Sequence, residues 1–263
     1  MNWFQAKAYL KYIFKKKHWR EGDFISSVAR DIAHFIIYNN YPFYRFEDIN
    51  DIRNDVLQSK QKVEVRDFGA GSKKFRSNHR ALRHLVKYNA SPQKQGELIF
   101  RFASYFKPNN IIELGTSLGL GTMYLALPNS QTKVYTIEGC PKVSNIANRL
   151  LGCAGANNVI QHVGPFREEL PKVLASVDQV GMVYFDGHHA YQPTLDYFHL
   201  CLPKATEASV FIFDDIYWSR EMAKAWNEIS AHPSVSLSFD FFRFGVLVLN
   251  VPHVEEHCVI KSI

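Results

Sequence analysis

The chain has 263 residues, of which 46% are hydrophobic, 14% aromatic and 21% charged. This composition is that of an ordinary globular protein, and it excludes disordered and fibrous chains. No segment recurs at the period of a solenoid or propeller, which excludes a repeat fold.

The formal net charge of +6 is unevenly distributed. Residues 1–105 hold 20 Lys and Arg against 10 Asp and Glu, whereas residues 106–263 hold 11 against 15. The basic charge therefore belongs to the first part of the chain. Such a segment favours encounters with nucleic acid or anionic lipid, but it defines neither a fold nor a reaction.

Residues 2–20 have the pattern of a basic amphipathic helix, with Lys7, Lys11 and Lys15 on one face. The apolar side chains available for the other face are Trp3, Tyr9, Leu10, Ile13 and Phe14. A helix of this kind can lie on a membrane. Packing on its own domain or on a second subunit is the favoured interpretation, so a homodimer stays open. A further helix is expected over residues 23–39.

A second cationic pattern precedes residue 106. Arg76, Arg80, Arg83 and Lys87 recur at helical spacing and predict four cations on one stripe of a helix. Two interpretations stay open: a solvated helix face, or a clamp for an acidic substrate or an RNA backbone. We expect residues 1–105 to form a basic, mainly helical extension that covers the acceptor side of a second domain, residues 106–263.

The sequence also bears on location. Lys7 and Lys11 interrupt the first 20 residues, so no secretion signal is expected, and no run of 18 apolar residues predicts a membrane span. The four cysteines contain no C-x-x-C pair, which argues against a zinc knuckle or a disulfide framework. A cytoplasmic protein is expected.

From residue 106 onward, short β-rich runs alternate with amphipathic segments of helix length, as in a parallel sheet with crossover helices. Seven strands are predicted at residues 111–114, 133–138, 159–163, 182–186, 209–214, 235–239 and 244–250. Helices are predicted near residues 120–127, 141–152, 167–175, 190–201 and 219–231. The last two strands are joined by only four residues and should form an antiparallel hairpin at one sheet edge. The expected fold is a Rossmann-like, doubly wound α/β sheet, mostly parallel.

The most informative stretch follows the first of these strands. The run ELGTSLGLGT, from Glu113 to Thr122, is a strand end, a glycine turn and a helix start. The turn stands at the carboxyl end of the strand, where open α/β sheets bind ligands. The second strand ends at Glu138, 19 residues after Gly119, where a carboxylate can accept both hydroxyls of a ribose. The order G-x-x-x-G-x-G differs from the dinucleotide fingerprint, so a pyrophosphate cradle is poorly supported.

At these residues the chain resembles the class I S-adenosylmethionine-dependent methyltransferases, and ELGTSLGLGT resembles their O-methyltransferase branch. The resemblance covers about residues 106–250. It implies that Glu113 and the backbone of the glycine turn hold the methionine part of the donor, Glu138 the ribose, and the segment after the third strand the adenine. The implied donor-binding residues are Glu113, Gly115, Thr116, Ser117, Gly119, Glu138, Gly164, Phe166 and Asp186. A second glycine segment, residues 67–72, also looks like such a motif, but no acid-ending strand follows it.

Three carboxylates end the fourth and fifth predicted strands: Asp186, Asp214 and Asp215. Clustered carboxylates repel one another, and a divalent cation such as Mg²⁺ would relieve the repulsion and activate an acceptor hydroxyl. The pattern is similar to the metal-dependent catechol and caffeoyl-CoA O-methyltransferases, which implies these three residues as metal ligands. Asp215 stands where those enzymes have asparagine, and His189 stands where they have a catalytic lysine. The implied catalytic residues are Asp186, His189 and Asp214.

The sequence thus predicts a methyltransferase that uses S-adenosylmethionine to methylate an oxygen of a small, potentially acidic molecule, with Mg²⁺ or another divalent cation as a candidate cofactor. Two alternatives stay open. One is an RNA or protein methyltransferase with the same donor, although nucleic acid is not favoured because the sequence lacks an N-P-P-[YF] motif. The other is a non-catalytic binding protein on a methyltransferase scaffold.

Overall fold

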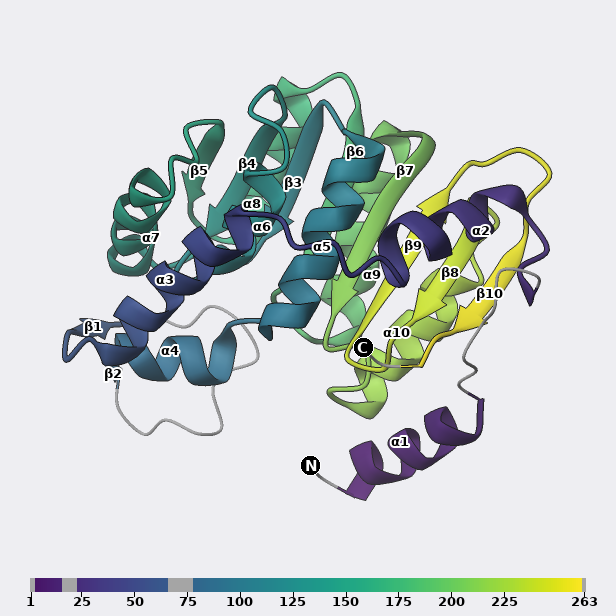
Figure 1. Ribbon diagram of the computed structural model, residues 1–263, viewed down its shortest axis with the longest axis horizontal. Coiled ribbons are helices and arrows are strands. Elements are labelled where there is room, and N and C mark those ends of the chain that lie inside the picture. The colour runs from purple at the N-terminus through teal and green to yellow at the C-terminus, as the bar shows by residue number, and fades with distance from the viewer. Residues whose placement is uncertain (1–2, 16–22, 66–77, 262–263) are drawn as a thin grey trace. The chain divides into compact units, whose positions relative to one another are not determined.

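Eight strands form the main sheet in the part of the chain that the structure, a computed structural model, describes: residues 3–15, 23–65 and 78–261 (Figure 1). The sheet is mostly parallel and carries helices on both sides, and the fold is Rossmann-like, as predicted. The chain divides into two compact units. We call residues 40–177 the central unit, and residues 1–39 together with 178–263 the composite unit.

The central unit contains three parallel strands, β3 (Asn110–Leu114), β4 (Lys133–Glu138) and β5 (Val159–Val163), in the order β3-β4-β5. β3 and β4 are buried almost throughout because their side chains are apolar on both faces. Ile160 and Val163 of β5 are exposed, since β5 stands at the end of the sheet order.

Six helices and a small hairpin complete the described part of the central unit. The helices are α3 (Arg45–Gln58), α4 (Leu82–Asn89), α5 (Gln93–Phe106), α6 (Leu120–Ala126), α7 (Pro141–Cys153) and α8 (Phe166–Ser176). β1 (Lys62–Glu64) pairs antiparallel with β2 (His79–Ala81). In α5, a Cβ at Gly96 would lie 2.2 Å from the ring of Tyr124 in α6, so glycine is what lets these two helices pack closely.

The hairpin changes the predicted cationic stripe. Arg80 lies in β2, opposite Val63, and its side chain is buried. The prediction of four cations on one helix face is therefore wrong, because the chain is extended at Arg80 and α4 begins only at Leu82. Arg83 and Lys87 remain exposed on α4. Arg76 and the second glycine segment, residues 67–72, lie outside the described residues.

The composite unit contains five strands in the order β10-β8-β9-β7-β6. They are β6 (Val180–Phe185), β7 (Ala205–Asp214), β8 (Val235–Asp240), β9 (Phe244–Leu249) and β10 (Glu256–Val259). β8 and β9 form the predicted antiparallel hairpin. Its expected edge position is wrong, because β9 lies between β7 and β8, and β10 pairs in parallel with β8. β10 is an eighth strand that the sequence analysis did not predict.

Helices from both ends of the chain belong to the composite unit. They are α1 (Trp3–Lys15), α2 (Ser27–Ile32), the π-helix η2 (Ala33–Ile37), α9 (Tyr191–Cys201), the 3-10 helix η3 (Leu202–Lys204) and α10 (Arg220–Ser230). The helix expected over residues 2–20 is present over Trp3–Lys15, and its other residues lie outside the described ones; the helix expected over residues 23–39 is present as α2 followed by η2. The expected packing face of α1 is wrong: Tyr12 is its buried residue, whereas Trp3, Leu10 and Phe14 are exposed.

A buried carboxylate connects the two ends of the chain in the composite unit. Glu256 of β10 accepts hydrogen bonds from the backbone N–H groups of Ile25 and Ser26 at 3.0 and 3.2 Å, and from the Ser26 hydroxyl at 3.1 Å. Ser26 is also the N-cap of α2, where its Oγ accepts from the N–H of Ala29. Glu256 therefore orders the cap that begins α2.

We expect Glu256→Ala to lower the free energy of unfolding by about 1–3 kcal/mol, because three donors at the start of α2 lose a charged acceptor. Urea unfolding measures the change. Glu255→Ala is the matched control, since Glu255 is the exposed neighbour of Glu256. Equal stability of the two variants would show that the carboxylate does not hold α2.

Candidate functional site

The glycine turn of the central unit is fixed by the strand beside it. The N–H groups of Gly115 and Thr116 donate to the carbonyl oxygen of Ile137 in β4, at 3.0 and 3.3 Å. Gly115 and Gly119 have φ angles of 116° and 81°, which glycine tolerates best. Ser117 takes a φ of 48° although it carries a side chain. The loop is thus held in one defined conformation at the end of β3.

Glu138 is hydrogen-bonded directly to the glycine turn. Its Oε2 accepts from the N–H of Ser117 at 2.9 Å, and its Oε1 accepts from the N–H of Cys140 at 2.9 Å. The side chain is only partly buried. The turn and the strand-end carboxylate, which the sequence suggested as two halves of one site, therefore converge.

Glu113 has a different environment from the one expected of a ligand-binding carboxylate. It is completely buried in β3, and its Oε2 accepts from the hydroxyls of Thr122 and Thr136 at 2.5 and 2.6 Å. The hydroxyl of Thr116 lies 2.5 Å from that of Thr136. Because Thr136 gives its one hydroxyl proton to Glu113, Thr116 is the donor in this pair. The chain Thr116–Thr136–Glu113 ties the glycine turn to the interior.

The pKa of Glu113 is raised to about 7: burial is the main cause, the hydrogen bonds from the two threonine hydroxyls act in the opposite direction, and the nearby Glu138 carboxylate adds to the rise. Its Oε1 has no hydrogen-bond partner among the described residues. A buried oxygen without a donor is less costly when the group carries a proton, which agrees with the raised pKa.

The segment after β5 completes this part of the central unit. The N–H of Gly164 donates to the carbonyl oxygen of Glu138 at 3.0 Å, so the ends of β4 and β5 are held together. Phe166, the first residue of α8, is partly exposed. Glu138, Gly164 and the glycine turn thus lie at one end of the three parallel strands.

Two residues of this network were missed in the sequence analysis. Thr136 lies opposite Glu113 in the β3–β4 register, and Thr122 lies in the first turn of α6. A fully buried threonine within an otherwise apolar strand is the signal that could have indicated a buried polar partner. The sequence placed Thr136 two residues before Glu138, and therefore on the same face of the strand.

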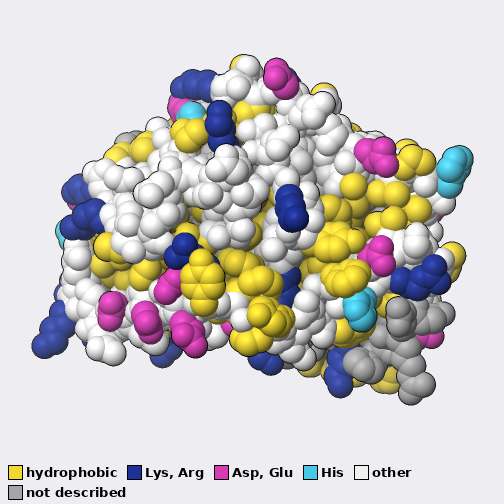
Figure 2. Space-filling model, turned by 45° about the horizontal axis from the view of Figure 1, so that its top comes forward, with side chains coloured by type: hydrophobic (Ala, Val, Ile, Leu, Met, Phe, Trp, Pro, Cys, Tyr) yellow, Lys and Arg dark blue, Asp and Glu magenta, His cyan; other side chains and the backbone are white. Residues whose placement is uncertain are grey.

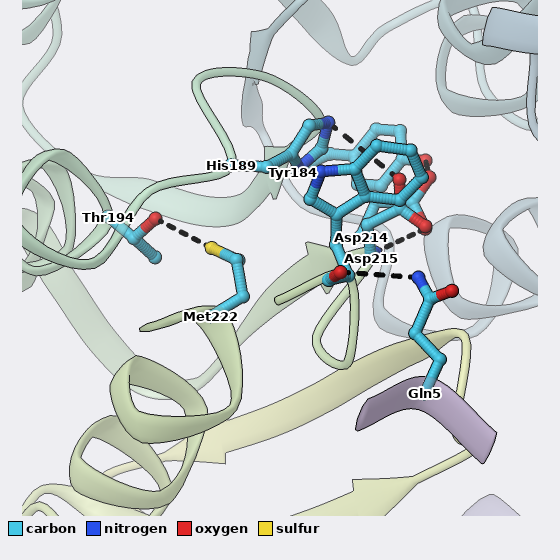
Figure 3. A network of polar contacts seen from close by, with 8 residues as sticks. Gln5, Tyr184, His189, Thr194, Asp214, Asp215 and Met222 are labelled. Carbon is cyan, nitrogen blue, oxygen red and sulfur yellow. Dashed lines mark hydrogen bonds and ion pairs between the residues drawn. The ribbon is translucent and has the colours of Figure 1, made fainter. Parts of the chain in front are cut away.

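The carboxylates that end β7 lie in the composite unit, and Figure 3 shows them with their neighbours. Asp214 is buried; its Oδ2 accepts from the hydroxyl of Tyr184 at 3.0 Å, and its Oδ1 accepts from the N–H of Asp215 at 2.8 Å. Asp215 has a φ of 52°, a conformation that Asp and Asn tolerate better than most residues. Burial and the Asp214 carboxylate raise the pKa of Asp215.

His189 approaches the same pair. Its Nε2 lies 4.0 Å from Oδ2 of Asp215, and both side chains are partly exposed. The structure therefore brings His189, Asp214 and Asp215 together. Asp186 directly follows β6 and is partly buried. Tyr184, which the sequence analysis did not single out, orients Asp214 from the neighbouring strand (Figure 3).

The carboxylates that follow β6 and end β7 are also the candidate metal ligands. Within residues 3–15, 23–65 and 78–261, no group of three or more His, Cys, Asp or Glu side chains is placed to hold a metal ion. Both oxygens of Asp214 already accept hydrogen bonds from the protein. We therefore derive no step through a metal, and the metal site over Asp186, Asp214 and Asp215 stays a prediction.

Comparison with known proteins agrees with this arrangement. Residues 112–216 match a family model described as a methyltransferase domain. By this match the segment is similar to a methyltransferase domain. The resemblance to the class I methyltransferases is thereby confirmed, together with the expectation of an enzyme domain. No curated protein sequence matches the chain.

Solved structures share the fold at low identity. The O-methyltransferase from Bacillus cereus, in complex with SAH, is 16% identical, with a TM-score of 0.56 over 86% of this chain and 98% of its own. TomG, the Streptomyces achromogenes O-methyltransferase in complex with SAM, is 16% identical, with a TM-score of 0.55 over 85% and 95%. The SAH-bound Podospora anserina methyltransferase PaMTH1 is 14% identical, with a TM-score of 0.58 over 86% and 97%.

The environment of Glu113 predicts a pH dependence of stability. Its pKa in the folded protein lies above its unfolded value of 4.5, so the stability it contributes is present at low pH and is lost as the pH rises through about 7. Between pH 5 and pH 8, we expect the free energy of unfolding of the wild type to fall on the order of 2 kcal/mol more than that of Glu113→Gln.

Urea unfolding at the two pH values measures this difference. Glu168→Gln is the control, since Glu168 is an exposed carboxylate on α8. A wild-type pH dependence that Glu113→Gln leaves unchanged would contradict the assignment of the titration to this buried carboxyl group.

Proposed function

We propose that this protein is an S-adenosylmethionine-dependent methyltransferase that methylates an oxygen of a small molecule. The observation that carries the proposal is the hydrogen bond from the N–H of Ser117 to the Glu138 carboxylate, which joins the glycine turn to the strand-end acid. The methyltransferase-domain match covers both residues. Structural neighbours that contain SAM or SAH, two of them described as O-methyltransferases, support the choice of donor and reaction.

In this proposal the central unit holds the donor. The Glu138 carboxylate, which accepts from Ser117 and Cys140 and is only partly buried, is the group that we assign to the ribose hydroxyls. The backbone of residues 115–119 faces the methionine part, and Gly164 and Phe166 face the adenine. Glu113 and Thr116 are buried, so they act as positioning residues for the turn.

We assign proton removal to His189: its Nδ1 takes the proton of the acceptor hydroxyl, while Asp215 stabilises the resulting imidazolium at Nε2. The acceptor oxygen then forms a bond to the methyl carbon as the carbon–sulfur bond of the sulfonium breaks. The electron pair of the broken bond stays on sulfur, which gives S-adenosylhomocysteine. Asp214 and Tyr184 hold the loop of Asp215, and Asp186 stays a candidate for donor or acceptor contact.

The surface is compatible with a small acceptor. Figure 2 shows Lys and Arg side chains scattered over the face that it draws, with Asp and Glu among them, instead of a continuous basic stripe. No helix within the described residues is long and apolar enough to cross a membrane. A cytoplasmic setting, and a covering role for residues 1–105 beside a catalytic domain of residues 106–263, remain part of the proposal.

Donor binding is tested with Glu138→Ala. We expect the affinity for S-adenosylhomocysteine to fall by at least about tenfold, because charged hydrogen bonds to the ribose are lost and the N–H of Ser117 loses its acceptor. Isothermal titration calorimetry measures the affinity. Glu168→Ala, which removes an exposed carboxylate of the same unit, should bind like the wild type. Wild-type affinity in a folded Glu138→Ala variant would refute the donor site.

The base is tested with His189→Gln. With labelled S-adenosylmethionine and a panel of small phenols and acidic phenols, we expect methyl transfer to fall about 10²- to 10⁴-fold, the range typical of a lost general base. Affinity for S-adenosylhomocysteine should not change. His199→Gln is the matched control, an exposed histidine on α9.

The same assay includes a chelator arm. Because the proposed base is His189 and no group of three or more His, Cys, Asp or Glu within the described residues is placed to hold a metal ion, we expect transfer to persist in the presence of EDTA. A rate that collapses with EDTA and returns with Mg²⁺ would instead support the metal site that the sequence suggests. Full activity of His189→Gln would exclude this histidine as the base.

A further inference from the structure

The outward face of α1 is not used by the proposed reaction. Trp3, Leu10 and Phe14 are 80%, 57% and 87% exposed. They stand at i, i+7 and i+11, a spacing that places them within about 40° of one another around a helix of 3.6 residues per turn. The three side chains therefore form one apolar ridge along the helix.

The opposite side of α1 is attached to the composite unit, so the ridge is held outward. Tyr12 is buried, and its hydroxyl donates to the carbonyl oxygen of Ile260. The rings of Tyr9 and Tyr12 lie 5.0 and 5.2 Å from the ring of Phe242. Gln5 donates to the carbonyl oxygen of Trp218 at 3.2 Å, as Figure 3 shows. These contacts fix which face of α1 packs and which face is left open.

The ridge has a charged flank of one sign. Lys7 and Lys11 are exposed and lie next to Trp3 and Phe14 on the helical wheel, and Lys15 ends the helix. The thirteen residues of α1 include no Asp or Glu. An apolar ridge bordered by lysines complements a surface that is apolar inside and negatively charged outside.

We propose that α1 docks on the surface of an anionic lipid bilayer. Trp and Phe side chains favour the boundary between acyl chains and headgroups, and lysines can bury their methylene stems while their ammonium groups meet lipid phosphates. At about 1.5 Å per residue, α1 is about 20 Å long, too short to span a bilayer, so it lies in the interface. A second copy of the chain fits less well, because a two-fold pair of these faces would oppose lysines with lysines.

The test uses the full-length protein and vesicle flotation. The probes are vesicles of phosphatidylcholine alone and vesicles of phosphatidylcholine mixed with phosphatidylserine. We expect the wild type to float with the mixed vesicles and to bind phosphatidylcholine vesicles at least about tenfold more weakly. The binding should fall as salt is added, since the lysines act through a screened potential.

Two double variants separate the contribution of the apolar ridge from that of the lysines beside it. Trp3→Ala/Phe14→Ala removes apolar area, and Lys7→Glu/Lys11→Glu reverses charge; each should lower binding to the mixed vesicles by about tenfold or more. Their matched controls are Ile25→Ala, which alters an exposed apolar residue outside α1, and Lys94→Glu/Lys133→Glu, which makes the same charge change on the central unit. Both controls should bind like the wild type.

Several outcomes would overturn the proposal. One is equal loss in Lys94→Glu/Lys133→Glu, because binding would then follow net charge and not α1. Another is no flotation together with a dimer in sedimentation that Trp3→Ala/Phe14→Ala dissociates, because the occupant would then be a second copy. Binding of S-adenosylhomocysteine by every variant, measured by calorimetry, shows that a lost vesicle signal is not lost folding.

Discussion

The structure of the candidate donor site depends on one carboxylate. Glu138 accepts an N–H from Ser117 in the turn and an N–H from Cys140 at the start of α7. Each of these groups would otherwise be a backbone donor at the end of a strand without a fixed partner. The side chain is only partly buried, so the carboxylate that shapes the turn is also the one to which the proposal assigns the ribose.

Behind this acceptor lies a second, buried layer of polar groups. Glu113, Thr136 and Thr116 connect the interior of β3 and β4 to the turn, and none of them is accessible to a ligand through its side chain. The proposal therefore gives the acidic residue that opens the glycine motif, Glu113, the role of supporting the backbone of the turn. A sequence motif alone does not distinguish a residue that contacts the ligand from a residue that positions the contacting group.

Much of the fold could be predicted because its strands and helices follow from local patterns of apolar and turn residues. The boundaries of β4 and β5 agree with the sequence prediction, since each is an apolar run bounded by turn residues. β10 was missed because Glu256–Val259 is short, and its pairing with β8 is set by distant partners. The stripe at Arg80 failed for a related reason: helical spacing is visible in sequence, but the β1–β2 pairing that overrides it is not.

The site was predictable to the same extent. The turn and Glu138 followed from spacing, whereas the geometry at Asp214 depends on Tyr184, 30 residues earlier and on another strand. Neither the hydrogen bonds that occupy Asp214 nor the positive φ of Asp215 could be inferred from residue types alone. The sequence alone therefore could not decide whether a metal ion or a histidine base activates the acceptor hydroxyl.

The bond between Glu256 and Ser26 has a consequence for biosynthesis. The helix α2 leaves the ribosome well before the strand that supplies its buried acceptor, because Glu256 lies 230 residues after Ser26. Residues 40–177 can collapse in the meantime, because their strands and helices are contiguous in the chain. We therefore expect residues 25–32 to remain without these native contacts until β10 has been translated, and to be a client for chaperones during that interval.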